Sequence, residues 1–423
     1  MRRLLPVLLL ALCTVPAHGQ SLSDRFNQLF TFGDCGRPLC LDVNATVHGE
    51  HYNPSIVQGE DDLLAFITNS IGLTVSQIPF AAATGGVTYS FESGVPVASS
   101  VSAGPIFADR AETLGRGQLL FGANVTGASF SQIRGVSLDD LLLRFTHEDV
   151  DPSPSLGDPV FERDYIEVTT NLDLSLLVTS IFAAYGVSDR VDIGIALPIV
   201  RSSMTGRSQA IIQQYSATTP HSFGTPSNPM QTAQASTEGS ATGLGDIAAR
   251  VKAHVYQGPT VGLALIGDLR LATGRSEDFL GSGATSIRIF GAASARYEAF
   301  SPHVNAGFQY TSADWATTRV LGTAGFDYLL GEQVTLAAEL MTNLEVGESK
   351  LTLPEPVVFT TPDVVQLPLT DIPDRNDNFV DAAIGAKIQA GTQLRLVTNI
   401  VVPLAKAGLR PGVTWTVGFE VSR

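Results

Sequence analysis

The segment Asp164–Val178, DYIEVTTNLDLSLLV, alternates apolar and polar side chains along its length. From Ile166 on, its even positions are apolar apart from Thr170, and its odd positions include Glu167 and Asp173. A period of two is typical of a β-strand whose faces meet different media. The run is also long enough to cross a bilayer, since a tilted transmembrane strand needs about 9–11 residues. We therefore expect its apolar face to meet lipid and its polar face, including Glu167 and Asp173, to meet a lumen.

The same alternation recurs through the remainder of the chain. With the first segment, twelve candidate strands carry it: 119–125, 164–178, 191–197, 247–255, 261–271, 287–297, 304–310, 320–328, 334–340, 378–389, 393–403 and 413–422. Two earlier segments, GVTYSFE and VPVASSVSA, flank Ser93-Gly94 and predict a hairpin. If this hairpin joined the others, the strand count would be fourteen.

The links between these strands differ systematically in length. Every second link is short, as in GVSD, QGP, EAFS, LLGE and AGT, whereas the links at 135–162, 206–243 and 347–376 are long. Short turns on one side and long loops on the other are typical of outer-membrane barrels, and an even strand count places both termini in the periplasm. The sequence therefore predicts an all-β protein, an antiparallel transmembrane up-and-down β-barrel of 12, possibly 14, strands, with a small N-terminal segment containing a short helix.

The N-terminus has the pattern of a secretory signal. Arg2 and Arg3 precede the apolar stretch 4–15, and Ala17-His18-Gly19 offers a cleavage site before Gln20. We expect three parts: a signal peptide at 1–19, a periplasmic or plug segment at 20–116, and an outer-membrane β-barrel at 117–423. The expected location is the outer membrane of a Gram-negative-type bacterium.

Charge and hydropathy narrow the class further. Loss of Arg2 and Arg3 leaves 24 basic residues against 41 acidic ones, a formal charge of −17. A secreted chain this acidic is a poor partner for nucleic acid. After the signal, no apolar run approaches the length of a transmembrane helix.

The segment 20–116 has two features of its own. Residues 61–71, DDLLAFITNSI, have the periodicity of a short amphipathic helix. Cys35 and Cys40 form an even pair in an oxidising compartment, which indicates a disulfide; zinc binding with His48 and His51 is the alternative. The segment either stays in the periplasm or folds back into the barrel as a plug.

Aromatic residues recur near the short turns, where a membrane-interface girdle is expected. Tyr185 and Tyr256 lie one position off the apolar phase, which requires a bulge or a frayed strand end. The candidate girdle residues are Tyr185, Tyr256, Tyr297, Tyr328, Trp415 and Phe419.

Charged side chains on the polar phase are candidates for a lumen lining. They form either a wet pathway that sets selectivity or a paired network that fills a narrow barrel. The candidate lumen-lining residues are Asp246, Arg250, Lys252, Asp268, Arg270, Arg288, Arg296, Glu339 and Arg395. We expect no metal centre and no cofactor.

A family resemblance rests on three motifs: GPIFADRAETLGRGQ at 104–118, GLGDIAARVKAHV at 243–255 and LRLATGRSEDFLGSG at 269–283. The chain resembles outer-membrane transporters of the phenol meta-cleavage pathway type, which are distantly similar to long-chain fatty-acid channels. The resemblance implies passive uptake of hydrophobic or aromatic small molecules, with the N-terminal segment as a hatch. Two departures are Ala272, where the family commonly has proline, and the C-terminal Arg423, where many barrels have an aromatic residue.

The sequence thus favours an outer-membrane channel for small, hydrophobic or aromatic solutes. A structural or adhesive barrel without transport is the main alternative. A phospholipase-type enzyme would need a lipid-facing Ser–His pair, and the nearest pair, Ser301 and His303, places the histidine on the inward phase, so we expect no enzyme. Expected partners are outer-membrane lipid and lipopolysaccharide, the barrel-assembly machinery and a small hydrophobic solute. The acidic run Asp139–Asp164 either holds cations that bridge lipopolysaccharide or is a solvated loop.

Overall fold

The computed structural model describes residues 20–32, 65–71, 89–92, 95–98, 103–146, 163–215, 221–225, 227–360, 363–391 and 393–423. The predicted signal peptide, the Cys35–Cys40 pair and the Ser93-Gly94 turn lie outside these residues. The helix expected at 61–71 is present at 65–71, and its first four positions lie outside the described residues.

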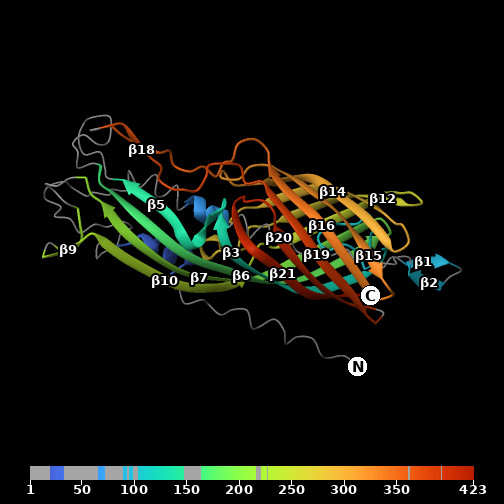
Figure 1. The fold of residues 1–423 in the computed structure, drawn as a ribbon. Coiled ribbons are helices and arrows are strands. Elements are labelled where there is room, and N and C mark those ends of the chain that lie inside the picture. The colour runs from blue at the N-terminus through green and yellow to red at the C-terminus, as the bar shows by residue number, and fades with distance from the viewer. Residues whose placement is uncertain are drawn as a thin grey trace, which may run out of the picture.

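Twelve antiparallel strands form a closed ring, in agreement with the sequence-based prediction (Figure 1). The last strand pairs with the first, with Val417 opposite Val125. Closure leaves no exposed strand edge in the ring, as a membrane barrel requires. The strands, in spatial order, are β3 (Leu119–Ile133), β6 (Tyr165–Ser188), β7 (Val191–Gln213), β11 (Ala248–Gln257), β12 (Val261–Arg270), β13 (Ser286–Ala295), β14 (Phe300–Thr311), β15 (Arg319–Leu330), β16 (Val334–Glu345), β19 (Phe379–Ala390), β20 (Leu394–Pro403) and β21 (Leu409–Ser422).

The early hairpin forms but stays outside this ring. Strands β1 (Tyr89–Glu92) and β2 (Val95–Ala98) pair only with each other. They project beyond one end of the barrel in Figure 1. The alternative of fourteen barrel strands is therefore wrong.

The two ends of the barrel differ as the link lengths predict. One end, here called the short-turn end, carries the tight β6–β7, β11–β12, β13–β14, β15–β16 and β19–β20 turns and the paired termini of the barrel, where Leu119 N–H donates to the Arg423 carbonyl at 2.7 Å. The other end, the long-loop end, carries small extra elements. These are β4 (Val136–Ser137), η2 (Leu138–Asp140), β5 (Leu141–Thr146), β8 (Phe223–Thr225), β9 (Asn228–Met230), η4 (Ser276–Asp278), β17 (Val357–Phe359) and β18 (Val365–Leu367).

One predicted loop is wrong. Residues 206–243 are not a free loop, because β7 continues to Gln213 and β10 (Thr232–Leu244) pairs along it from Ile211 to Ile199. Gly245 N–H still bonds the Pro198 carbonyl at 2.8 Å, so β10 and β11 follow β7 as one interrupted strand. The wall therefore extends well past the shorter strands at the long-loop end (Figure 1).

The outer surface of the ring is an apolar band. Large hydrophobic side chains on every barrel strand are exposed there, including Leu265 at 52%, Phe308 at 62% and Ile384 at 62%. A contiguous exposed apolar surface of this kind requires an apolar environment, and on a closed barrel that environment is lipid. Among the described residues, no helix is both long and apolar enough to cross a membrane.

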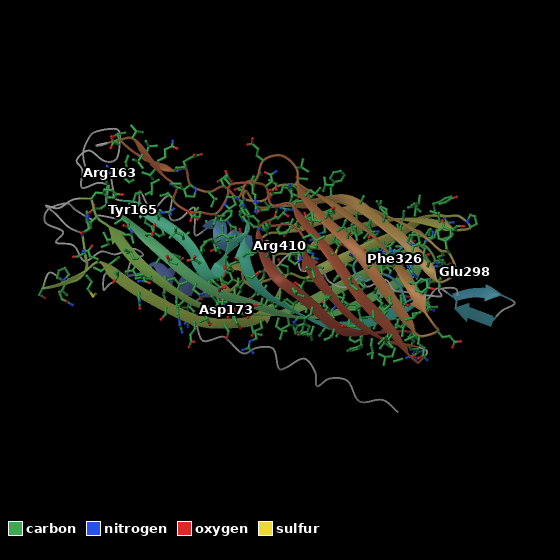
Figure 2. All side chains as sticks on the ribbon, viewed as in Figure 1. Arg163, Tyr165, Asp173, Glu298, Phe326 and Arg410 are labelled. Atoms are coloured by element: carbon green, nitrogen blue, oxygen red, sulfur yellow. The ribbon has the colours of Figure 1, made fainter. Side chains whose placement is uncertain are left out.

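Strand β6 reverses the orientation predicted for Asp164–Val178. Its even side chains are buried along the whole strand, Leu174 at 0%, and its odd side chains face outward, polar at Asp173 but apolar at Leu177 and Ile181. Figure 2 shows Asp173 at the outer edge of the ribbon. The alternation is therefore continuous, and only the outer medium changes, from water around the extension to lipid around the ring. Glu167 and Asp173 face away from the lumen, so their predicted lumen position is wrong.

The inward apolar face of β6 packs on N-terminal residues. Helix α1 (Leu22–Asn27) begins with a capping box between Ser21 and Asp24 and continues into η1 (Gln28–Phe30). Phe26 and Phe30 are fully buried in the same cluster as the inward side chains of β6. Gly206 on β7 allows this approach, because a Cβ there would lie 2.6 Å from Leu29 Cδ1. The N-terminal residues thus fill the long-loop half of the barrel.

Candidate functional site

Residues 103–116 run inside the barrel, nearer the short-turn end. Glu339 on β16 accepts backbone N–H groups from Ile106 at 2.7 Å, from Phe107 at 3.0 Å and from Ala108 at 3.1 Å. A carboxylate that accepts several amide hydrogen bonds holds the backbone firmly, since charge-assisted bonds are the strong ones. This internal segment, 103–116, is therefore fixed to the wall at its first turn.

The next residues of the internal segment are held by a different set of strands. Arg110 Nη2 lies 2.5 Å from Asp327 Oδ2 on β15. Asp109 exchanges two hydrogen bonds with Asn305 on β14, at 2.6 and 2.8 Å. Leu114 N–H then donates to Asp192 on β7 at 2.8 Å. The segment consequently crosses the lumen from β16 to β7.

Glu112 adds an ion pair with Arg296, the residue directly after β13, whose Nη2 lies 2.7 Å from Glu112 Oε1. Burial raises the pKa of the Glu112 carboxyl, but the guanidinium groups of Arg296 and Arg110 lower it more. The net pKa lies below the ordinary value, so Glu112 is ionised at neutral pH and holds Arg296.

Beside the internal segment, inside the ring, lies a cavity of about 250 Å³. Its wall combines aromatic side chains with charged ones, contributed by strands from β6 round to β21. Its lining includes Phe107, Asp109, Phe182, Asp192, Gly194, Arg250, Lys252, Asp268, Arg270, Arg288, Phe290, Met341, Phe379, Asp381 and Arg410. Arg410 lies near mid-barrel in Figure 2.

The register of three strands creates a charged row across this wall. Arg250 on β11 faces Asp268 on β12, and Asp268 faces Arg288 on β13. Arg250 forms two bonds with Asp268, at 2.6 and 2.8 Å, and also reaches Asp109 of the internal segment at 2.9 Å. One guanidinium therefore links the wall to the internal segment.

The structure divides the predicted lumen-lining residues into groups. Arg250, Lys252, Asp268, Arg270 and Arg288 line the cavity. Arg296 and Glu339 instead bind the internal segment, through Glu112 and the three amides.

The remaining two predicted residues stabilise the wall and a loop. Asp246 accepts hydrogen bonds from Gly274 N–H at 3.0 Å and from the Ser282 N–H and hydroxyl at 2.9 and 2.8 Å, so it orders the β12–β13 loop. Arg395 lies 3.4 Å from Glu420, which also meets Lys387 at 3.5 Å.

All six candidate girdle residues are exposed on the outer surface, between 38% for Phe419 and 56% for Tyr297. Tyr185 shares the outward phase of β6, and the ladder of β11 has a register shift between His254 and Tyr256. The bulge that the sequence required at Tyr256 is thus present. Trp415 differs from the tyrosines, because it pairs opposite Gly127 in mid-strand rather than beside a short turn.

Ser301 and His303 are 4% and 2% exposed and face away from lipid. The His303 ring lies 3.7 Å from both Asp327 and Glu339, the two carboxylates that hold the internal segment. Among the described residues, no group of three or more His, Cys, Asp or Glu side chains is placed to hold a metal ion.

Sequence reasoning missed Asp109, Arg110 and Arg410. The first two stand in the motif GPIFADRAETLGRGQ, shortly before the first barrel strand. The signal that could have found them is the group of charged residues Asp109, Arg110 and Glu112. Arg410 pairs with Asp381 and lies 4.9 Å above the Phe379 ring. No strand alternation marks it, since it stands where the β3–β21 register shifts.

The fold and site together define a transmembrane β-barrel whose lumen holds its own N-terminal residues. No family model matches the chain, and no curated protein matches it. Among solved structures, the COG4313 outer membrane channel from Pseudomonas putida F1 aligns at a TM-score of 0.41 and 10% identity, over 74% of this chain and 98% of that one. A Pseudomonas aeruginosa FadL homologue aligns at 0.30 and 10%, over 72% and 88%, respectively. A mutant of the TodX monoaromatic hydrocarbon channel aligns at 0.32 and 8%, over 73% and 90%. The phenol meta-cleavage type expected from the sequence stays a prediction.

Proposed function

We propose that this protein is an outer-membrane channel for the passive uptake of small hydrophobic or aromatic molecules, and that its N-terminal residues act as the plug. The supporting observation is the cavity of about 250 Å³ inside the barrel beside the internal segment, which contributes Phe107 and Asp109 to its wall. Ligand sites are concave, largely apolar and carry a few oriented polar groups. A barrel filled only for mechanical strength has no need of such a space.

In this proposal the internal segment is the movable part. Its hydrogen bonds to Glu339, Asn305 and Asp192 join one strip of chain to separate strands, and it carries no strand of its own. Detaching that strip would connect the cavity with the short-turn end, taken to be the periplasmic side, without breaking the barrel ladder. The proposed solute enters from the long-loop side, occupies the cavity and leaves past residues 103–116.

The test blocks the cavity with a matched pair of substitutions. Gly194 lines the cavity and has room for a Cβ, its nearest contact being 3.4 Å away; Gly267 on β12 stands on the outward phase with nothing within 4 Å. Gly194→Trp fills the cavity, whereas Gly267→Trp adds the same side chain to the lipid face. Both variants and the native chain are produced in the outer membrane of a host with intact lipopolysaccharide, and initial uptake of radiolabelled toluene is measured.

The channel proposal expects uptake above the host background for the native chain and for Gly267→Trp, and background uptake for Gly194→Trp. If the native chain, correctly inserted, gives no uptake above background, the channel proposal is wrong and a structural barrel is favoured. Equal uptake by both tryptophan variants would place the route outside the cavity.

A further inference from the structure

Lys252 on β11 is a buried lysine whose ammonium group lacks a hydrogen-bond partner among the described residues. Its side chain is 0% exposed, lines the cavity, and its ammonium group makes no hydrogen bond within the part of the chain that the structure describes. Asp192 stands directly opposite in the β7 ladder, yet no ion pair joins the two side chains. One Asp192 oxygen accepts the Leu114 amide instead. An ammonium group held in this way is costly unless something else compensates its charge.

The surrounding wall carries more cation than the protein neutralises. Within the described residues, Arg288 donates its Nε–H to an uncharged group, Gln309 Oε1, at 2.8 Å. The cavity lining contains five cationic residues and four carboxylates, and Asp268 and Asp109 are both used by Arg250. The lining thus has one more cation than carboxylates, and within the described residues neither Lys252 nor Arg288 forms an ion pair.

Apolar surface completes the site. Phe290 occupies the ladder row of Lys252, because Lys252 faces Ile266 and Ile266 faces Phe290. Phe107 from the internal segment and Phe182 from β6 also line the same cavity. Aromatic side chains offer ring-stacking surface, so the site pairs an apolar compartment with adjacent cations.

We infer that the cavity binds a small organic anion, a carboxylate or similar acid attached to one apolar ring, with the acid group on Lys252 and Arg288 and the ring among the phenylalanines. The inference rests on the proposed function and narrows its substrate class from neutral aromatic solutes to aromatic or alicyclic acids. The volume of about 250 Å³ suits a single ring, being slightly smaller than the roughly 300–1,000 Å³ of drug-sized pockets.

The test compares benzoate with benzamide, which have nearly the same shape and differ in charge. Binding of each to the full mature protein in detergent is measured by calorimetry. We expect benzoate to bind at least about tenfold more tightly, since a hydrogen bond to a charged group is worth roughly 1.5–3 kcal/mol. Lys252→Met and, separately, Arg288→Gln should each weaken benzoate binding by roughly 10- to 100-fold and leave benzamide binding unchanged.

Lys387→Met is the matched control. Lys387 is also a buried lysine on the inward face, but it pairs with Glu420 and does not line the cavity. Folding of each variant is checked by its heat-modifiable mobility on a gel. If Lys252→Met fails to fold, Arg288→Gln and the native comparison of the two ligands still decide the matter.

Three outcomes would overturn the inference: no benzoate binding by the native chain, equal affinity for benzoate and benzamide, or unchanged benzoate affinity in a folded Lys252→Met variant. The last would make Lys252 a water-mediated structural partner of Asp192. Benzoate binding without uptake of either toluene or benzoate would instead contradict the channel proposal and leave the anion site standing. Toluene uptake without a preference for benzoate over benzamide would overturn the anion site and leave the channel proposal standing.

Discussion

Arg110 of the internal segment and Asp327 of β15 form an ion pair of 2.5 Å, with side chains 5% and 0% exposed. The two residues are far apart in the sequence, and their contact joins the N-terminal residues to the middle of the barrel wall. A buried pair of this kind is a poor source of net stability but is expensive to break, because the remaining partner keeps an uncompensated charge. It is therefore one of the contacts that hold the segment inside the lumen.

Replacing Asp327 with Asn should release this contact. Loss of one partner of a buried pair costs about 3–5 kcal/mol, so amide hydrogen exchange in residues 103–116 should accelerate by roughly 100-fold or more. Asp314→Asn, in the exposed β14–β15 loop, is the control and should leave that exchange unchanged. Equal exchange in the two variants would show that Arg110 does not hold the segment.

Glu339→Gln tests the other fixing point. An amide oxygen can still accept the Ile106 and Phe107 N–H groups, but the bonds lose their charge assistance, which is worth about 1.5–3 kcal/mol. Exchange of the amides at 106–108 should rise by roughly 10- to 100-fold, with no comparable change in α1. Glu332→Gln, in the exposed β15–β16 turn, serves as the reference.

Phe26→Ala tests the packing in the long-loop half. Phe26 is fully buried against its neighbours, with Phe30 at 5.5 Å between ring centroids. Removing a buried phenylalanine costs about 3–5 kcal/mol, so exchange should accelerate in residues 22–30. Phe308→Ala removes a ring that is 62% exposed on the lipid face and should not affect these residues. If Phe26→Ala leaves exchange at 22–30 unchanged, the helix does not depend on this cluster.

Acid should weaken the hold of Glu112 on Arg296. The pKa of Glu112 lies below its ordinary value of 4.5, so the carboxylate stabilises the folded segment above about pH 4.5 and loses that effect as the pH falls through the lowered pKa. The native chain and Glu112→Gln should differ in the amide hydrogen exchange rates of residues 103–116. This difference should be largest at neutral pH and vanish in strong acid. Rates are compared after correction for the intrinsic acid dependence of exchange. A difference that persists in strong acid would contradict the assignment.

The fold was predictable because its cause is local. A period of two over many segments, with alternating link lengths, specifies twelve strands and their antiparallel order before any tertiary contact is known. The orientation of β6 was not predictable in the same way, since Ile166 and Leu177 are both apolar and only their height in the barrel decides which one meets lipid. A strand that leaves the membrane can bury its apolar face against the chain's own N-terminus.

The site was predictable only in part for a related reason. Alternation marks Arg250, Lys252, Asp268, Arg270 and Arg288 as inward, and the structure places them on the cavity wall. Asp109, which meets Arg250, and Arg110, which meets Asp327, lie in an extended segment without periodicity, so no pattern in the strands could indicate them. An inward charge binds the internal segment where a residue of that segment lies beside it, as for Arg296 and Glu339. The strand pattern does not show where that segment runs.

The most direct measurement is single-channel conductance in planar bilayers, comparing the native mature chain with the double variant Asp327→Asn/Glu339→Gln. Both fixing points of the internal segment are then weakened while the barrel ladder is untouched. A plugged channel predicts low conductance for the native chain and a clear rise for the double variant. If the double variant inserts, shows rapid exchange at 103–116 and still conducts no better than the native chain, the internal segment is not what closes the barrel.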